Sequence, residues 1–307
     1  MATEILPSLP FRVEIEVINR CNIKPACDYC YAGPFDGKTI ELEDLKFVIS
    51  KTERQVSPFE VIFLGGEPFL RSDMVDILEF AKITFSTHLL SMSTNGTMLK
   101  TLSEDKLARL RALSEGNPLI QVSIDSTRNP TVQKSLRSLE GIMVLEKHDI
   151  PFNIGIVITR RNLHNYLETL DDLLKFPHLM GINAESLQKT SEPYYNQNRL
   201  TLEEEYLVVP SIEKLAAERS RTDVYIVNSN KNHCLFQMLR GDGRELKPED
   251  RRITNAGVYV NGNVSMDGAL GRHQIVGNVF KEDWRTIWEN AIRVFREEKA
   301  TKLRVVA

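Results

Sequence analysis

The chain has 307 residues, of which 42% are hydrophobic and 26% are charged, and this composition excludes a disordered, collagen-like or coiled-coil protein. The formal net charge is −3 and no block of basic residues stands out, so we expect no nucleic-acid partner and no membrane-surface partner. No apolar run approaches the ~20 residues of a membrane span, and the first residues lack the pattern of a signal peptide, which favours a cytoplasmic location.

The first 188 residues alternate short β-rich runs with amphipathic segments of helical length. Strands are predicted over residues 11–18, 59–64, 88–93, 119–124, 152–158 and 180–186. Helices are predicted between them, over residues 41–52, 72–83, 103–113, 135–147 and 165–175. This alternation is typical of parallel βαβ units. Because six units fall short of the eight that close a TIM barrel, we expect an α/β fold with a partial, open (β/α)6 TIM-like barrel.

The pattern changes after residue 188. Residues 191–200 are polar and irregular, a helix is predicted over 202–218, and a short strand over 224–227. Residues 257–266 predict a hairpin that turns at Asn261-Gly262, and residues 281–299 predict a final helix. We therefore expect two domains, a partial barrel over 1–190 and a small α+β C-terminal extension over 191–307.

Three of the four cysteines lie within ten residues, directly after the first predicted strand: Cys21, Cys27 and Cys30 in RCNIKPACDYC. In a cytosolic chain, such thiols bind metal or act in catalysis more often than they form disulfides. A structural zinc site needs four ligands, and no fourth one lies in this loop. A [4Fe–4S] cluster with one iron left open fits three thiolates. On spacing alone, the cluster is favoured and zinc is the alternative.

Three further polar motifs stand at the ends of predicted strands, where parallel α/β folds carry their working loops. They are LGGEPF with Gly65, Gly66 and Glu67, STNG with Ser93 and Asn95, and SIDS with Ser123 and Asp125. Each motif alone is also typical of an ordinary turn.

Together, the cysteine loop and the GGE motif resemble those of the radical S-adenosylmethionine (SAM) superfamily. The resemblance implies one [4Fe–4S] cluster on the three cysteines, whose open iron chelates the methionine moiety of SAM. It implies that the Gly65–Glu67 segment receives the amino group of SAM through backbone carbonyls, with Glu67 in support. It also implies that Tyr29, which precedes the last cysteine, lies against the adenine.

The other two motifs stand in the order that the family shows, and the resemblance implies that they also bind SAM. Ser93 and Asn95 would contact the sugar or the methionine, and Ser123 and Asp125 would add contacts from the fourth strand. The family's usual loop is Cys-x3-Cys-x2-Cys, whereas the first gap here holds five residues. We expect Lys24-Pro25-Ala26 to bulge outward.

The C-terminal third resembles the SPASM/twitch extensions of radical SAM enzymes, which hold auxiliary clusters with several cysteines. Here Cys234 stands at the first such position, Asp267 follows the predicted hairpin, and no later cysteine follows. We therefore expect a degenerate extension without an auxiliary cluster, which caps the barrel and shapes the substrate pocket. Cys234 is interpreted as a buried free cysteine, with substrate contact and unusual cluster ligation as alternatives.

The resemblance implies an enzyme that cleaves SAM to a 5′-deoxyadenosyl radical and abstracts hydrogen from a substrate C–H bond, with flavodoxin or ferredoxin as electron donor. Because SPASM-like tails often occur in enzymes that modify ribosomally made peptides, we expect peptide natural-product (RiPP) maturation, with recognition supplied by a separate protein. The alternative is a small-molecule substrate such as a sugar, nucleoside or cofactor precursor. A remote alternative is a non-catalytic metal-binding protein. No residue is assigned a catalytic role from the sequence.

Overall fold

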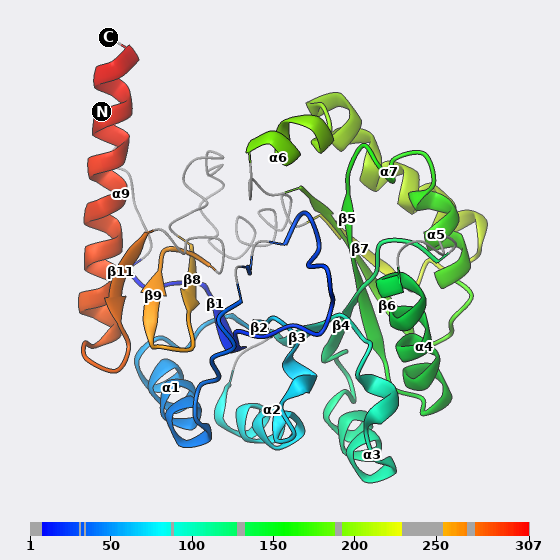
Figure 1. The fold of residues 1–307 in the computed structure, drawn as a ribbon, viewed down its shortest axis with the longest axis horizontal. Coiled ribbons are helices and arrows are strands. Elements are labelled where there is room, and N and C mark those ends of the chain that lie inside the picture. The colour runs from blue at the N-terminus through cyan, green and yellow to red at the C-terminus, as the bar shows by residue number, and fades with distance from the viewer. Residues whose placement is uncertain are drawn as a thin grey trace. The chain divides into compact units, whose positions relative to one another are not determined.

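The computed structural model describes residues 8–30, 32–33, 35–86, 89–127, 133–187, 192–228, 254–268 and 274–306 (Figure 1). The chain forms two compact units. The first comprises Met1–Arg20, Pro34–Leu90 and Glu245–Ala307, and the second comprises Cys21–Gly33 and Ser91–Arg244. None of the described helices combines the length and the apolar composition that a membrane span requires. The domain boundary near residue 190 stays a prediction.

The first unit is built around a parallel pair of strands to which the C-terminal segment adds further strands. β1 pairs parallel with β2 on one side and with β8 on the other, and β8 and β9 form an antiparallel hairpin. Its strands are β1 (Arg12–Ile18), β2 (Glu60–Gly65), β8 (Asn255–Val258), β9 (Asn263–Ser265), β10 (Asp267–Gly268) and β11 (Ile275–Asn278). Its helices are α1 (Leu42–Gln55), α2 (Met74–Thr84), α9 (Trp284–Val306) and the short 3-10 helix η1 (Pro68–Leu70).

Two tryptophans anchor the last helix in the core of this unit. Trp284 and Trp288 are fully buried, and their spacing of four residues places them on one face of α9. α9 packs against β11, and the contact is visible in Figure 1. On α1, the buried ammonium group of Lys51 donates to the backbone oxygens of Val279 and Glu282, both at 2.7 Å. The C-terminal segment is thus an integral part of the first unit.

The second unit contains a parallel sheet that begins at β3 and whose successive strands are joined by helices. β4 pairs with β3, β5 with β4, β6 with β5 and β7 with β6, all in parallel. Its strands are β3 (Leu89–Thr94), β4 (Ile120–Ser123), β5 (Phe152–Ile158), β6 (Leu179–Ser186) and β7 (Tyr225–Asn228). Of β3, the residues from Ser91 onward belong to this unit. Its helices are η2 (Leu99–Thr101), α3 (Glu104–Leu113), α4 (Gln133–Lys147), α5 (Tyr166–Leu173), α6 (Glu192–Asn198) and α7 (Leu202–Glu218).

The α/β class is confirmed, and all six strands and five helices predicted for the barrel are present. The parallel strands β1–β7 number seven, one more than the six predicted, because the segment near 224–227 pairs parallel with β6. They form no closed barrel in the described part of the chain. The predicted hairpin turn is also confirmed, with Gly262 at a φ of 78°.

One prediction was wrong: residues 192–198 form helix α6, where an irregular segment was expected. The segment is polar and has no apolar period, so its sequence gives no helical signal. Local polar contacts support the helix instead, since the Asn198 side chain donates to the Tyr194 carbonyl oxygen at 2.9 Å. The following helix α7 begins at a capping box between Thr201 and Glu204.

Candidate functional site

The three neighbouring cysteines lie on the loop of residues 21–33, called here the cluster loop, which belongs to the second unit. All three are free thiols and are partly exposed to solvent. The backbone N–H of Cys30 donates to the carbonyl oxygen of Cys27 at 2.9 Å, which closes the turn across CDYC. Residues 24–26 are exposed, in agreement with the outward bulge expected for the lengthened first gap.

The three thiols are compatible with an iron–sulfur cluster. Among the described residues, no three His, Cys, Asp or Glu side chains converge on a position for one metal ion. A mononuclear zinc site requires such convergence. In a [4Fe–4S] cluster each thiolate binds a different iron, so the thiols surround a volume instead of a point. Three accessible thiols on one loop therefore fit a cluster with one iron free of protein ligands.

Asn95, at the end of β3, connects the STNG motif to the start of the cluster loop. Its side-chain N–H donates to the Asn22 side-chain oxygen at 2.9 Å and to the Cys21 sulfur at 3.8 Å. Its side-chain oxygen accepts from the backbone N–H and hydroxyl of Thr97, at 3.0 and 2.6 Å. Asn22 donates to the same hydroxyl at 2.8 Å. A hydrogen bond to a ligating sulfur is one of the ways in which proteins tune a cluster.

Sequence reasoning missed Asn22 and Thr97 in this network. Thr97 directly follows STNG and Asn22 directly follows Cys21, so both are neighbours of predicted residues. Neither residue type is diagnostic, because Asn and Thr are common in turns. Only the pairing of two loops reveals their role.

The turn that carries Asn95 requires a glycine, and a residue of α4 stabilises it through a hydrogen bond. Gly96 has a φ of 75°, and a Cβ at this position would lie 2.8 Å from a methyl group of Val122. Ser138 of α4 donates its hydroxyl to the Asn95 carbonyl oxygen at 2.6 Å. This tight turn therefore also fixes the direction of the Asn95 side chain.

Tyr29 connects the cluster loop to the end of β4, because its hydroxyl donates to the carboxylate of Asp125. Burial raises the pKa of Tyr29 well above its ordinary value, and the charges of Asp125 and Cys27 raise it further. The phenol is therefore a neutral hydrogen-bond donor at physiological pH. The structure thus brings together two of the residues predicted from the sequence.

Ser93 and Ser123 share one face of two neighbouring strands. Ser93 pairs with Gln121, which precedes Ser123 by two residues, and side chains two residues apart on a strand point the same way. Both serines are partly exposed. Their placement permits ligand contact at the ends of β3 and β4.

The GGE motif lies in the first unit, against the residues that immediately precede Cys21 in the chain. A Cβ on Gly65 would lie 2.3 Å from the Ile18 carbonyl oxygen, so only glycine fits. The backbone N–H groups of Gly66 and Glu67 donate to the carbonyl oxygens of Ile18 and Arg20, at 2.9 and 2.8 Å. The segment is therefore held by its N–H groups.

Glu67 itself is fully buried, and one of its carboxylate oxygens accepts from the Phe69 backbone N–H at 3.0 Å. This contact caps the short helix η1 and gives the side chain a structural role. Its predicted support of the SAM amino group stays a prediction. Cys234, the fourth cysteine, lies outside the described residues.

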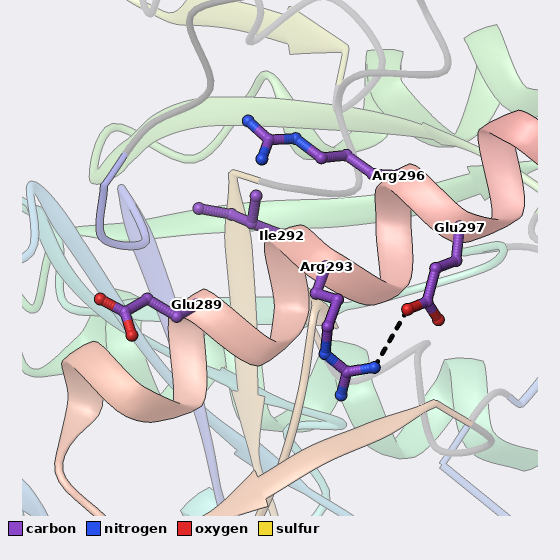
Figure 2. Close-up of a pocket in the computed structure, with 5 residues that line it drawn as sticks. All are labelled: Glu289, Ile292, Arg293, Arg296 and Glu297. Carbon is purple, nitrogen blue, oxygen red and sulfur yellow. Dashed lines mark hydrogen bonds and ion pairs between the residues drawn. The ribbon is translucent and has the colours of Figure 1, made fainter.

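A pocket of about 430 Å³ lies along α9 of the first unit and contains none of the predicted site residues. In Figure 2, Arg293 and Glu297 point to one side of the helix and form an ion pair at 3.1 Å, and Ile292 and Arg296 point away from them. The remaining lining residue is Glu289. An exposed, charged helix face of this kind indicates no particular chemistry.

Comparison with known proteins gives matches across most of the chain. The family model of the radical SAM superfamily matches residues 15–174, more than half of the chain. A probable GTP 3′,8-cyclase of Saccharolobus solfataricus is 29% identical over 226 residues, which cover 71% of each protein. A PqqA peptide cyclase of Rhodopseudomonas palustris is 24% identical over 209 residues, and the match covers 63% of this chain and 51% of the relative.

Among solved structures, SuiB of Streptococcus suis with the bound precursor peptide SuiA matches with a TM-score of 0.70 at 15% identity. The match covers 92% of this chain and 65% of the SuiB chain. SuiB has also been solved with S-adenosylmethionine bound. This similarity shows a shared fold over nearly the whole of the present chain.

Proposed function

The chain belongs to the radical SAM superfamily, and from this premise we propose that it abstracts a hydrogen atom from a C–H bond of a peptide during natural-product maturation. It is an enzyme that uses a [4Fe–4S] cluster and SAM, so the non-catalytic alternative is wrong. With a reduced [4Fe–4S] cluster and SAM bound, the site would supply a 5′-deoxyadenosyl radical as the hydrogen-abstracting group. The net reaction on the substrate stays open.

Cys21, Cys27 and Cys30 are the proposed cluster ligands, in one cluster per chain. The observation that carries this assignment is that Asn95 donates to the Cys21 sulfur while Tyr29, inside the CDYC turn, donates to Asp125. Both contacts connect the cysteine loop to the ends of β3 and β4. Such outer contacts orient metal ligands and tune the metal.

The proposed SAM contacts come from all four motifs. In the first unit, backbone carbonyl oxygens of the Gly65–Glu67 segment are the proposed acceptors for the ammonium group of SAM, and the N–H groups of Gly66 and Glu67 hold the segment by donating to Ile18 and Arg20. In the second unit, the polar side chains Asn95 and Asp125 offer partners for the ribose or the methionine. The full set of proposed contact residues is Tyr29, Gly65, Gly66, Glu67, Ser93, Asn95, Ser123 and Asp125.

A peptide is the proposed substrate because two similar proteins are named for, or solved with, peptides. The PqqA peptide cyclase is a sequence relative, and SuiB was solved with its precursor peptide. The proposed partners are flavodoxin or ferredoxin as electron donor and a separate peptide-recognition protein. We further propose that the C-terminal segment is a SPASM/twitch-like extension without an auxiliary cluster.

A small-molecule substrate is the second candidate. The probable GTP 3′,8-cyclase matches with higher identity than the peptide cyclase and over a larger share of both proteins. Its name indicates a nucleotide substrate. This observation favours a nucleoside or related cofactor precursor if the peptide proposal fails.

The two candidates are separated by a substrate-dependent assay. Anaerobically reconstituted protein is incubated with SAM and dithionite, once with a short peptide that a neighbouring gene encodes, where such a gene exists, and once with GTP. A mass change of the peptide, together with an increased rate of 5′-deoxyadenosine formation, is the expected result. A product from GTP and an unchanged peptide would contradict the peptide proposal.

A further inference from the structure

Both residues between Cys27 and Cys30 have side-chain partners elsewhere in the second unit. Tyr29 donates to Asp125 at the end of β4. Asp28 accepts from Arg161, three residues after the end of β5, with 2.9 Å between the guanidinium nitrogen and the carboxylate oxygen. Two successive residues of the turn are thus held by the ends of two successive strands.

Arg161 is presented by a rigid turn. The side-chain oxygen of Asn162 accepts from the Thr159 backbone N–H at 2.7 Å, and its side-chain N–H donates to the Val157 carbonyl oxygen at 2.9 Å. The Arg161 backbone N–H donates to the Thr159 hydroxyl at 3.2 Å. These hydrogen bonds fix the backbone of Arg161, so its side chain extends from a defined position.

The same guanidinium group contacts helix α6. Its central carbon lies 5.1 Å from the centre of the Tyr194 ring, a distance typical of a cation–π contact. Arginine can stack its plane on an aromatic ring and still donate to a carboxylate from its edge. Burial raises the pKa of Tyr194, the neighbouring charge of Arg161 lowers it, and the charges of Asp28, Asp125 and Cys27 raise it further.

Global stability does not explain this bridge. The side chains of Arg161 and Asp28 are 62% and 59% exposed, and ion pairs at this exposure contribute little to folding. We propose that Arg161 is a positioning residue, which holds the Cys27–Cys30 turn through Asp28 and seats α6 beside that turn through Tyr194. The bridge thereby limits access of solvent and small molecules to the cluster.

Arg160 supplies a matched control for this proposal. It is the neighbouring residue and forms an exposed ion pair with Glu204 at the start of α7, at 3.0 Å. That pair does not involve the cluster loop. The variants Arg161→Gln and Arg160→Gln therefore remove equal charges and similar ion pairs, and they differ in the connection to the turn.

The test measures how fast an iron chelator removes the cluster under anaerobic conditions. Arg161→Gln and Asp28→Asn should lose iron about two- to fivefold faster than the wild type, the factor to which an exposed ion pair corresponds. Arg161→Lys should restore most of the protection, since it keeps the ion pair. Arg160→Gln should match the wild type. Equal rates in all variants, or equal acceleration by Arg160→Gln, would overturn the proposal.

A second measurement is made on the cluster-free protein, so that it does not depend on the cluster assignment. Hydrogen–deuterium exchange of the peptide that spans residues 26–31 should accelerate in Arg161→Gln and Asp28→Asn and stay unchanged in Arg160→Gln. An unchanged exchange rate in the first two variants would contradict the positioning role. Absence of iron in the wild type would instead contradict the cluster assignment.

Discussion

The two units use their polar side chains in different ways. In the first unit, polar groups are buried and bond to the backbone: Lys51 donates to two carbonyl oxygens, and Arg71 donates to those of Val17 and Ile40. In the second unit, the polar groups around the cluster loop bond to one another and to a cysteine sulfur; Asn95 and Thr97 are buried, whereas the three thiols are partly exposed. The first arrangement stabilises the backbone of its unit, and the second leaves the thiols accessible to a ligand.

The contrast predicts that substitutions in the second unit alter the binding or the properties of the cluster, and that those in the first unit alter the free energy of unfolding. The largest effect is expected for Cys27→Ala, which removes one of three cluster ligands. Iron content after anaerobic reconstitution should fall to background, and 5′-deoxyadenosine formation should be abolished. Cys234→Ala is the control and should keep its iron. Full iron loading by Cys27→Ala would contradict the ligand assignment.

In the first unit, Gly65→Ala should destabilise the fold by about 3 kcal/mol, because the added Cβ would collide with the Ile18 carbonyl oxygen. Urea unfolding of the cluster-free protein measures this effect. Gly33→Ala, in the second unit, is the control for an added methyl group, since its Cβ would meet no atom within 4 Å. Equal stability of both variants would show that the GGE segment can move away from β1.

Asn95→Asp keeps the oxygen that accepts from Thr97 and replaces the N–H group that donates to Cys21. The expected result is about tenfold slower SAM cleavage, with a more negative cluster potential because a negative charge is added near the sulfur. The unfolding free energy should also fall, by about 1–3 kcal/mol, because the buried carboxylate would face the Asn22 oxygen and the Cys21 sulfur. The exposed Asn196→Asp is the control for charge. An unchanged cluster reduction potential would show that Asn95 does not influence the cluster.

A second test in the first unit is Lys51→Met, which leaves the Val279 and Glu282 carbonyl oxygens without their donor. The variant should lose about 2 kcal/mol of unfolding free energy and keep its iron content. Lys46→Met on the same helix removes an exposed ion pair with Glu43 and should cost about 0.5 kcal/mol or less. Loss of iron without loss of stability in Lys51→Met would break the contrast between the units.

The sequence predicts the strands well because their alternation of buried and exposed residues is strong, as in residues 11–18. It misses α6 because that helix depends on contacts such as Asn198 to Tyr194, which have no periodic signature. Within the candidate site, the cysteines and Asn95 are evident from motif order. Asn22, Thr97 and Arg161 are not, because common residue types acquire their roles only when distant loops meet.

Glu67 illustrates a different limit. Its place in a GGE motif predicts a ligand contact, and the structure gives its carboxylate a capping bond to Phe69. Sequence alone cannot distinguish these uses, because both place a carboxylate directly after two glycines. The distinction depends on burial, which for Glu67 is complete.

The most direct test of the central claim measures iron, sulfide and SAM cleavage on the same anaerobically reconstituted sample. We expect about four irons per chain and formation of 5′-deoxyadenosine upon reduction with dithionite. A value near eight irons would contradict the single cluster and indicate an auxiliary site in the C-terminal segment. Absence of both iron and 5′-deoxyadenosine would contradict the assignment of the three cysteines and the mechanism that depends on them.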